Sequence, residues 1–487
     1  MAKKQFYLNN KKLKGEGVSI EFTPEQAVEL AKCAKDPVYF AKKWVKIVSL
    51  DSGAGIVGFD CMWDYQENII RQCDRNRFNI IMMPRQYGKS ISIVSFILHQ
   101  IIFKDHHAVA IFANKKFASK KDIQKLKIAY ENLPFWIQQG VVEWNKESIK
   151  LENGSTVEAG ATSESSGRSG SYNLVLLDEF ALVQKNVADE FMRAAYPTIT
   201  SGKSSKIIVV STAKGMNQFY KLWKDATSIP KKNNYVPLEV KWSDMPGRDE
   251  QWKQEQIFGL GSEEAFNQEF GNQFFGDTSS TLISPLKLKR MDYLSPIFSE
   301  NNLDIFKQPK LEHSYVMCVD TAHGVGADYS AFLVIDVTHP IQEVVAKYKN
   351  NLISPLVYPI IVHDVAKKYN NAFVLVETND VGCQVADALN YEFEYENLFS
   401  SVSDRYVGTY KALMGTYQRK AKAGVRTTKT VKNIGCSTLK TLIENDKLIL
   451  NDFDIISEFT TFISQGSSYA AESGSYDDLV MCLVLFV

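Results

Sequence analysis

The sequence has no net charge, no paired cysteines and no long apolar run. Its 56 lysines and arginines balance 56 aspartates and glutamates, so no overall basic field indicates nucleic-acid binding, although local basic patches remain possible. The seven cysteines form no C-x-x-C pair and no secretory leader precedes them, which favours a cytosolic protein with reduced thiols. No apolar stretch approaches the roughly 20 residues that a membrane helix requires, so we expect no membrane partner.

Histidine clusters and internal repeats are also missing. The seven histidines show no ligand spacing, and only His323, close to Asp320, is a candidate for approaching a metal. No repeat of about 20 to 50 residues is present. The class of the protein therefore has to be inferred from local patterns.

The length and the apolar content indicate two well-packed domains. A chain of 487 residues, 45% of them hydrophobic, is too long for one ordinary core. From about residue 78, short β-rich runs alternate with amphipathic ones, which is typical of a mainly parallel α/β sheet. These runs predict strands at residues 78–84, 108–113, 173–180 and 206–212, and helices at residues 89–103, 115–133 and 187–199.

The composition changes after residue 280. Residues 281–311 are rich in Ser, Asn and Pro, so they predict a linker between an N-terminal domain, residues 1–280, and a C-terminal domain, residues 312–487. The second domain opens with two apolar runs around a Gly-rich turn, residues 314–337, which predicts a hairpin. Residues 372–380 predict a further strand.

Gly88, Lys89 and Ser90 lie between an expected strand and an expected helix, which is the setting of a phosphate-binding loop. The usual pattern G-x-x-x-x-G-K-[ST] is altered, because Met83 occupies the first glycine position and "PRQYGKS", which includes Arg85 and Gln86, follows. Backbone N–H groups at a helix start favour anionic oxygens, Lys89 can reach the β- and γ-phosphates of ATP, and Ser90 can ligate Mg²⁺. Taken alone, the segment is equally an ordinary polar turn.

An acidic pair supplies the carboxylates that an ATPase site needs in addition to its phosphate-binding loop. The apolar run "LVLLDEF" ends in Asp178 and Glu179, as a buried strand would that delivers two carboxylates at its end. Asp178 can hold Mg²⁺ through water, and Glu179 can polarise the attacking water. Such a pair alone is more often a solvated cap, but together with the loop it indicates an ATPase.

Three smaller features fit the same domain. Tyr65 and Gln66 precede the loop, where an aromatic ring could stack on adenine and an amide could bind its edge, or where a surface helix could simply begin. Ser211 and Thr212 end a strand, with hydroxyls placed to sense a γ-phosphate. Arg168 lies in a small-residue loop before the acidic strand and is a candidate arginine finger.

Acidic residues mark a second site in the C-terminal half. Asp320 ends an apolar strand, Asp328 follows the Gly-rich turn, and Glu377 ends another strand, while Asp477 and Asp478 begin an apolar helix. Each acid singly is most simply a cap. Together and in this order they predict an RNase H-like nuclease, since two Mg²⁺ or Mn²⁺ ions held by carboxylates activate water and stabilise the leaving oxygen.

A basic segment lies between these acids. Residues 417–432 carry Arg419, Lys420, Lys422, Arg426, Lys429 and Lys432 without one acidic residue. A charge run is usually a solvated face. Beside a nuclease site, its Gly and Thr content also suits a loop that grips DNA phosphates without base specificity.

The constellation resembles the large terminase subunit of tailed bacteriophages, most closely the T4-like type. The phrases that carry the resemblance are "PRQYGKS", "VDTAHGVGADYSA", "LVETNDVG" and "YDDLVM", and it extends from about Tyr65 to Asp478. It implies a P-loop ATPase domain of the RecA/ASCE type followed by an RNase H-like nuclease domain. The partners that it implies are double-stranded DNA, the portal protein of a procapsid and a small terminase subunit.

The resemblance also implies where such a protein acts and which residues serve it. A pentameric ring on the portal would translocate DNA with ATP and cut concatemers, in the host cytoplasm and transiently at the portal vertex, and would be absent from the mature virion. Lys89 and Ser90 would hold phosphates and Mg²⁺, and Asp320, Glu377 and one of Asp477 or Asp478 would bind the nuclease metals. Arg85 would act within its own subunit, with Arg168 favoured as the finger that reaches a neighbour. An ATP-dependent helicase or repair nuclease is the alternative enzyme class, and a structural capsid protein with vestigial sites is the non-enzymatic one.

Overall fold

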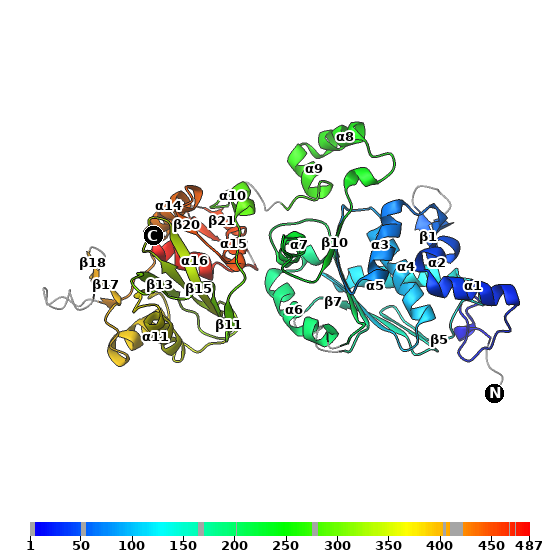
Figure 1. Cartoon of the computed structure of the whole chain (residues 1–487), viewed down its shortest axis with the longest axis horizontal. Coiled ribbons are helices and arrows are strands. Elements are labelled where there is room, and N and C mark those ends of the chain that lie inside the picture. Colours follow the sequence, from blue (N-terminus) through cyan, green and yellow to red (C-terminus); the bar gives the residue numbers. More distant parts are fainter. Residues whose placement is uncertain are drawn as a thin grey trace. The chain divides into compact units, whose positions relative to one another are not determined.

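The computed structural model divides the chain into two compact units, Met1–Phe275 and Gly276–Val487. The described residues are 5–49, 55–163, 170–200, 202–274, 281–402, 406–409, 422–466, 468–472 and 474–487. Figure 1 shows the first unit in blue to green and the second in green to red. None of the helices that the structure describes has the length and apolar character of a membrane-spanning segment.

A sheet of eight strands forms the centre of the first unit, in the order β10-β3-β9-β8-β4-β7-β6-β5. The strands are β3 (Phe78–Met82), β4 (Ala108–Ala113), β5 (Val141–Trp144), β6 (Ser148–Leu151), β7 (Thr156–Ala161), β8 (Leu174–Asp178), β9 (Lys206–Ser211) and β10 (Val236–Glu239). Neighbours from β10 to β7 run parallel, while β6 and β5 add an antiparallel edge. The predicted mainly parallel sheet is confirmed, and its central strands read as continuous apolar runs because both faces are buried.

Helices cover both faces of this sheet. The helices of this unit are α1 (Pro24–Lys35), α2 (Pro37–Trp44), α3 (Asp64–Arg75), α4 (Lys89–Phe103), α5 (Lys116–Glu131), α6 (Lys185–Thr200), α7 (Gln218–Thr227), α8 (Glu250–Leu260) and α9 (Glu263–Glu269), of which α8 and α9 lie apart from the sheet; a small hairpin consists of β1 (Lys46–Ser49) and β2 (Gly55–Gly58). Figure 1 places α3 and α4 on one side of the sheet and α6 and α7 on the other. Helix α4 is buried almost all round, as expected for a helix whose apolar residues cover every face.

A second sheet forms the centre of the second unit, in the order β11-β12-β15-β14-β13-β16, with β20 beside β15. The strands are β11 (Phe298–Glu300), β12 (Leu303–Ile305), β13 (Tyr315–Asp320), β14 (Ser330–Asp336), β15 (Gln342–Asn350), β16 (Phe373–Val376) and β20 (Leu448–Ile449). The predicted hairpin is confirmed as β13 and β14, and β16 runs parallel to β13. The ends of β13 and β16 that carry acidic residues therefore meet at one edge.

The remaining elements of the second unit surround this sheet. They are α10 (Pro285–Arg290), α11 (Tyr358–Lys368), α12 (Gly382–Asp387), α14 (Lys429–Glu444), α15 (Phe453–Phe459) and α16 (Asp478–Phe486), and the short strands β17 (Phe399–Val402), β18 (Tyr406–Thr409), β19 (Lys422–Ala423), β21 (Phe462–Gln465) and β22 (Ser468–Ala471). Helix α16 packs on β13 and β14, and α14 and α15 pack on α16. This packing brings the start of α16 to the acidic end of β13.

The described part of the expected linker, residues 281–311, is folded structure of the second unit. It contains α10, β11 and β12, and β12 pairs with β15 through Leu303, Asp304 and Ile305. Ile305 is completely buried in that unit's core. The Ser, Asn and Pro content of this stretch marks turns between short elements, which a composition argument reads as a linker.

Candidate active sites

The phosphate-loop segment connects β3 to α4, as the sequence predicts. Gly88, with φ of 72°, ends the segment and has the backbone that favours glycine, and a Cβ there would also displace the Gln66 amide, whose Nε2 would lie 2.4 Å away. The Tyr65 hydroxyl donates to the Tyr87 carbonyl at 3.0 Å, and Tyr65 is only 6% exposed. Tyr65 and Gln66 thus support the loop from α3, and their contact with a nucleotide base stays a prediction.

Lys89 faces the acidic pair at the end of β8. Its Nζ lies 3.6 Å from Asp178 Oδ1 and 3.6 Å from Glu179 Oε1. Burial raises the pKa of Asp178 to about 6, Lys89 opposes that shift, and the buried neighbour Asp122 adds to it. Glu179 has a left-handed φ of 53° and a side chain that is 38% exposed, so it turns out of the strand toward solvent.

Residues of β9 join the phosphate loop to the acidic pair. The Ser211 carbonyl accepts the Met83 N–H at 3.2 Å, and the Ser211 hydroxyl accepts the Ala181 N–H at 3.1 Å. Thr212 is buried beside it, and Ser90 is half-buried in the first turn of α4. Ser211 thus connects the phosphate-loop segment at Met83 with the residues after Glu179 at Ala181.

The two candidate arginines differ in what the structure says of them. Arg85 is exposed in the loop beside Gln86, and its Nε lies 3.5 Å from Glu269 Oε2 on α9. Arg168 lies outside the described residues. The roles of both stay predictions.

Three acids of the second unit come together. Burial, followed by the charges of Glu377 and Asp478, raises the pKa of Asp320 well above its usual range. The parallel pairing of β13 with β16 explains the approach, since the Glu377 N–H donates to the Val319 carbonyl at 2.9 Å. Burial and the charge of Glu458 raise the pKa of Asp478 to about 7, which Lys349 opposes.

The other expected acids and His323 lie differently. Asp477 turns toward the basic segment, with its Oδ2 3.6 Å from Lys432 Nζ and accepting the Ala471 N–H, so the geometry favours Asp478 over Asp477 as a ligand. Asp328 is exposed in the turn after β13 and makes no ion pair with any residue that the structure describes. His323 Nε2 lies 2.5 Å from Asp380 Oδ2 in two exposed loops.

Each site offers one buried carboxylate oxygen that a divalent cation could bind. Asp178 Oδ1 and Asp478 Oδ2 are buried oxygens with no hydrogen-bond partner in the described chain, and hard cations prefer such carboxylate oxygens. No three His, Cys, Asp or Glu side chains among the described residues already have the geometry of a metal-binding set. The charges of Glu377 and Asp478 instead act on Asp320, and a divalent cation would neutralise the three acids.

Two family models match the chain. Residues 80–290 match the N-terminal part of the large terminase subunit of T4likevirus type, and residues 317–486 match the terminase RNaseH-like domain. The chain belongs to the large terminase family. The first unit of this terminase is accordingly its ATPase unit and the second its nuclease unit.

Solved large terminases match this terminase at low sequence identity. The HK97 bacteriophage large terminase is 11% identical, with coverage of 93% of this chain and 98% of that chain and a TM-score of 0.48. A large terminase from a thermophilic bacteriophage, solved in complex with ADP, is 11% identical, covering 88% and 98%, with a TM-score of 0.37. The magnesium-bound large terminase nuclease of the thermophilic phage G20c is 20% identical, covering 42% and 95%, with a TM-score of 0.33.

The described part of the basic segment of the terminase, residues 422–432, runs beside the nuclease acids. Val425 pairs with Glu377, just after β16. Gly424, with φ of 84°, lets these two backbone segments come close, because a Cβ there would lie 2.5 Å from the Val376 carbonyl oxygen. Lys422, Arg426 and Lys429 are exposed, and Lys432 lies beside Asp477. Arg419 and Lys420 fall outside the described residues.

Sequence reasoning missed a residue that joins the segment to the site. Asn379 Nδ2 donates to Glu377 Oε1 at 2.9 Å and to the Thr427 carbonyl at 3.1 Å. It orients the Glu377 carboxylate and ties it to the basic segment. The signal available was its place in "VETND", two residues after the predicted ligand.

Proposed function

We propose that this terminase drives double-stranded DNA into a viral procapsid through the portal and cuts concatemeric DNA. The observation that carries the proposal is that one chain holds a lysine facing two carboxylates at the end of a strand in one unit, and three clustered acids beside exposed basic residues in the other. A motor that must both hydrolyse ATP and cut DNA needs these two chemistries. The small terminase subunit and a pentameric ring on the portal are proposed partners, in the host cytoplasm and away from the mature virion.

In the ATPase unit, Lys89 and the loop backbone would bind the phosphates of ATP. Ser90 and Asp178 would hold Mg²⁺, which when bound neutralises phosphate charge. Glu179 would accept a proton from the attacking water, since its side chain is 38% exposed and water can reach it. Ser211 and Thr212 would transmit the state of the site, while Arg85 would sense the γ-phosphate and Arg168 would reach a neighbouring subunit.

In the nuclease unit, Asp320, Glu377 and Asp478 would hold Mg²⁺ or Mn²⁺, which when bound activates water and stabilises the leaving oxygen. Arg426 and Lys429 are exposed beside this site, so they would bind DNA phosphates and bring the backbone to the acids. Their contacts carry no base specificity.

A packaging assay with purified procapsids tests the proposal. We expect ATP-dependent protection of DNA from added nuclease, and no protection with Glu179→Ala. Duplex unwinding without any filling of procapsids would overturn the packaging function in favour of a helicase.

A further inference from the structure

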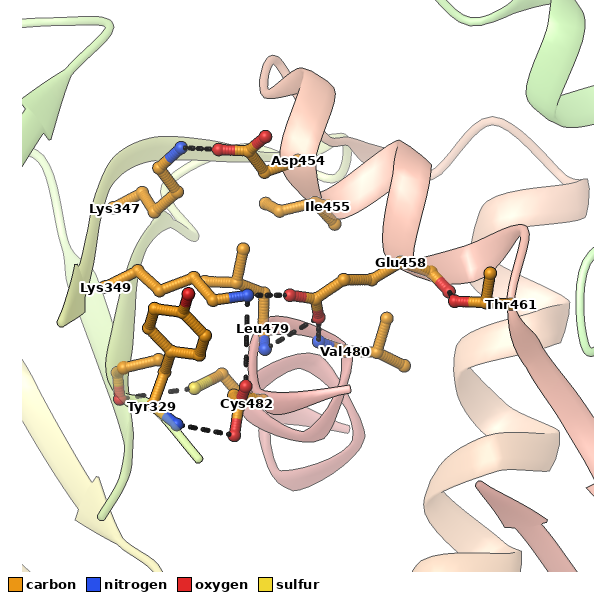
Figure 2. A network of polar contacts seen from close by, with 12 residues as sticks. Tyr329, Lys347, Lys349, Asp454, Ile455, Glu458, Thr461, Leu479, Val480 and Cys482 are labelled. Atoms are coloured by element: carbon orange, nitrogen blue, oxygen red, sulfur yellow. Dashed lines mark hydrogen bonds and ion pairs between the residues drawn. The ribbon is translucent and has the colours of Figure 1, made fainter. Parts of the chain in front are cut away.

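Two largely buried lysines lie side by side on β15. Lys347 and Lys349 are two residues apart, so their side chains share one face of the sheet, and Figure 2 shows both reaching toward α15. Lys347 Nζ lies 2.8 Å from Asp452 Oδ2, 2.7 Å from Asp454 Oδ2 and 3.1 Å from Asp304 Oδ2. It is a neutralised structural lysine. Lys349 pairs with Glu458 and, unlike Lys347, also faces the nuclease site, with its Nζ 3.8 Å from Asp478 Oδ2.

Glu458 holds the start of α16. It is 3% exposed, and while one carboxylate oxygen binds Lys349, Oε2 accepts the N–H groups of Leu479 at 2.9 Å and Val480 at 3.1 Å (Figure 2). The first N–H groups of a helix have no partner within the helix, so a carboxylate from another helix replaces the usual cap. Since α16 begins at Asp478, Glu458 fixes the backbone of that residue.

The Asp478 side chain is held from two further directions. Its Oδ1 accepts the Tyr329 N–H at 3.3 Å, which leaves Oδ2 as the oxygen with no hydrogen bond in the described chain. The ammonium of Lys349 is itself held over the ring of Tyr329, 4.5 Å from the centroid, and near that of Tyr476, at 5.6 Å. A fixed positive charge therefore stands between two buried carboxylates and offsets their repulsion.

We propose that Lys349 and Glu458 are positioning residues of the nuclease site, which hold Asp478 so that its Oδ2, which accepts no hydrogen bond in the described chain, can bind a divalent cation. The inference rests on the proposed role of Asp478 as a metal ligand. Neither residue needs to touch the metal or DNA. Lys349 locates Glu458, Glu458 locates the first turn of α16, and that turn carries Asp478.

Binding of Mn²⁺ to the full chain, measured by calorimetry without nucleotide or DNA, tests the inference. Partners that orient metal ligands typically affect metal affinity by about 10- to 100-fold, so we expect Lys349→Met to weaken Mn²⁺ binding by at least about tenfold. Lys347→Met is the control, because it removes another buried lysine from the same strand without contacting Asp478; it leaves Asp452 and Asp454 unpaired and should lower the unfolding temperature, but the Mn²⁺ affinity of the folded protein should stay close to that of wild type. Glu458→Gln, which keeps one acceptor oxygen for α16, should bind more tightly than Glu458→Leu. ATP hydrolysis by the first unit and thermal unfolding report on the fold of each variant.

The possible results distinguish the positioning role of Lys349 and Glu458 from the role of Asp478 as a metal ligand. Asp478→Asn measures how much Mn²⁺ binds at other sites. If this variant binds Mn²⁺ with wild-type affinity, Asp478 is not a metal ligand. If Asp478→Asn loses the binding while Lys349→Met keeps it, the metal site stands and the positioning role is wrong. An equal loss in Lys347→Met and Lys349→Met would assign the effect to general destabilisation and would also overturn the inference. If Lys349→Met does not fold, the inference is tested by comparing the Mn²⁺ affinities of Glu458→Gln and Glu458→Leu, and equal affinities would overturn it.

Discussion

The ATPase unit and the nuclease unit each place a lysine against a buried carboxylate, yet the two lysines are held differently. Lys89 stands 3.6 Å from both Asp178 and Glu179 and belongs to the phosphate loop. Lys349 stands 3.8 Å from Asp478 but is also paired with Glu458. The first lysine can exchange its carboxylates for phosphate, whereas the second is anchored and can only shape the site.

The acids show the matching difference. In the ATPase unit, burial is the main cause that raises the pKa of Asp178, Asp122 adds to it, and Lys89 and Lys125 oppose it. In the nuclease unit, Asp320 meets two further carboxylates in addition to burial, and Asp478 meets Glu458. The nuclease site therefore has more negative charge to neutralise, so we expect it to depend more strongly on a divalent cation.

Removal of a nuclease acid should give the largest effect and separate the two sites completely. Asp320→Ala should abolish metal-dependent DNA cleavage while ATP hydrolysis stays near normal. Burial and the charges of Glu377 and Asp478 raise the pKa of Asp320. Removing the Asp320 carboxylate therefore relieves repulsion among these acids, and the unfolding temperature should not fall. Asp364→Ala, at an exposed position on α11, is the control. Full cleavage by Asp320→Ala would remove this residue from the site.

The corresponding change in the ATPase unit is Glu179→Ala. A positioned base contributes about 10²- to 10⁴-fold, so hydrolysis should fall by that factor while nucleotide binding and DNA cleavage persist. Phosphate release, fluorescent nucleotide binding and plasmid cutting measure the three properties. Glu255→Ala, an exposed acid on α8, should behave as wild type. Retained turnover in Glu179→Ala would sink its water-activating role.

The position of acidic residues at the ends of buried strands could be predicted, because an apolar run that stops at an acidic residue is visible in the sequence. This held for Asp178 at β8 and for Asp320 at β13, whose placement the structure confirms. Lys349 could not be predicted, since "AKYKN" alternates apolar and charged residues like a strand with one solvent face, and only the packing of α15 buries the charged side. Glu458 gives no local signal either, because its partners Leu479 and Val480 are distant in sequence.

The pH dependence of the two activities should also differ. Burial raises the pKa of Asp178 to about 6 and that of Asp478 to about 7, and below its pKa a carboxyl keeps a proton and cannot ligate a cation. With Mg²⁺ below saturation, cleavage should fall by at least about tenfold per pH unit as the pH drops through 7, because the pKa of Asp320 is raised as well, and hydrolysis only as it drops through 6. Saturating Mg²⁺ should move both midpoints to lower pH. Coincident midpoints at low Mg²⁺ would contradict the difference between the two sites.

The smallest effect should come from the basic segment, which adjoins the nuclease acids. Arg426 is exposed one residue before Thr427, whose carbonyl is bound by Asn379, so its charge stands near Glu377 without being neutralised by an ion pair in the described chain. Arg426→Ala should lower the slope of log binding constant against log salt concentration by about 1, because one phosphate contact is lost. Lys440→Ala makes the same charge change near the other end of α14 and should leave the slope unaltered. Equal salt slopes for Arg426→Ala and Lys440→Ala would show that DNA does not lie along the segment beside Glu377, and the acids would then have to receive their substrate from another side.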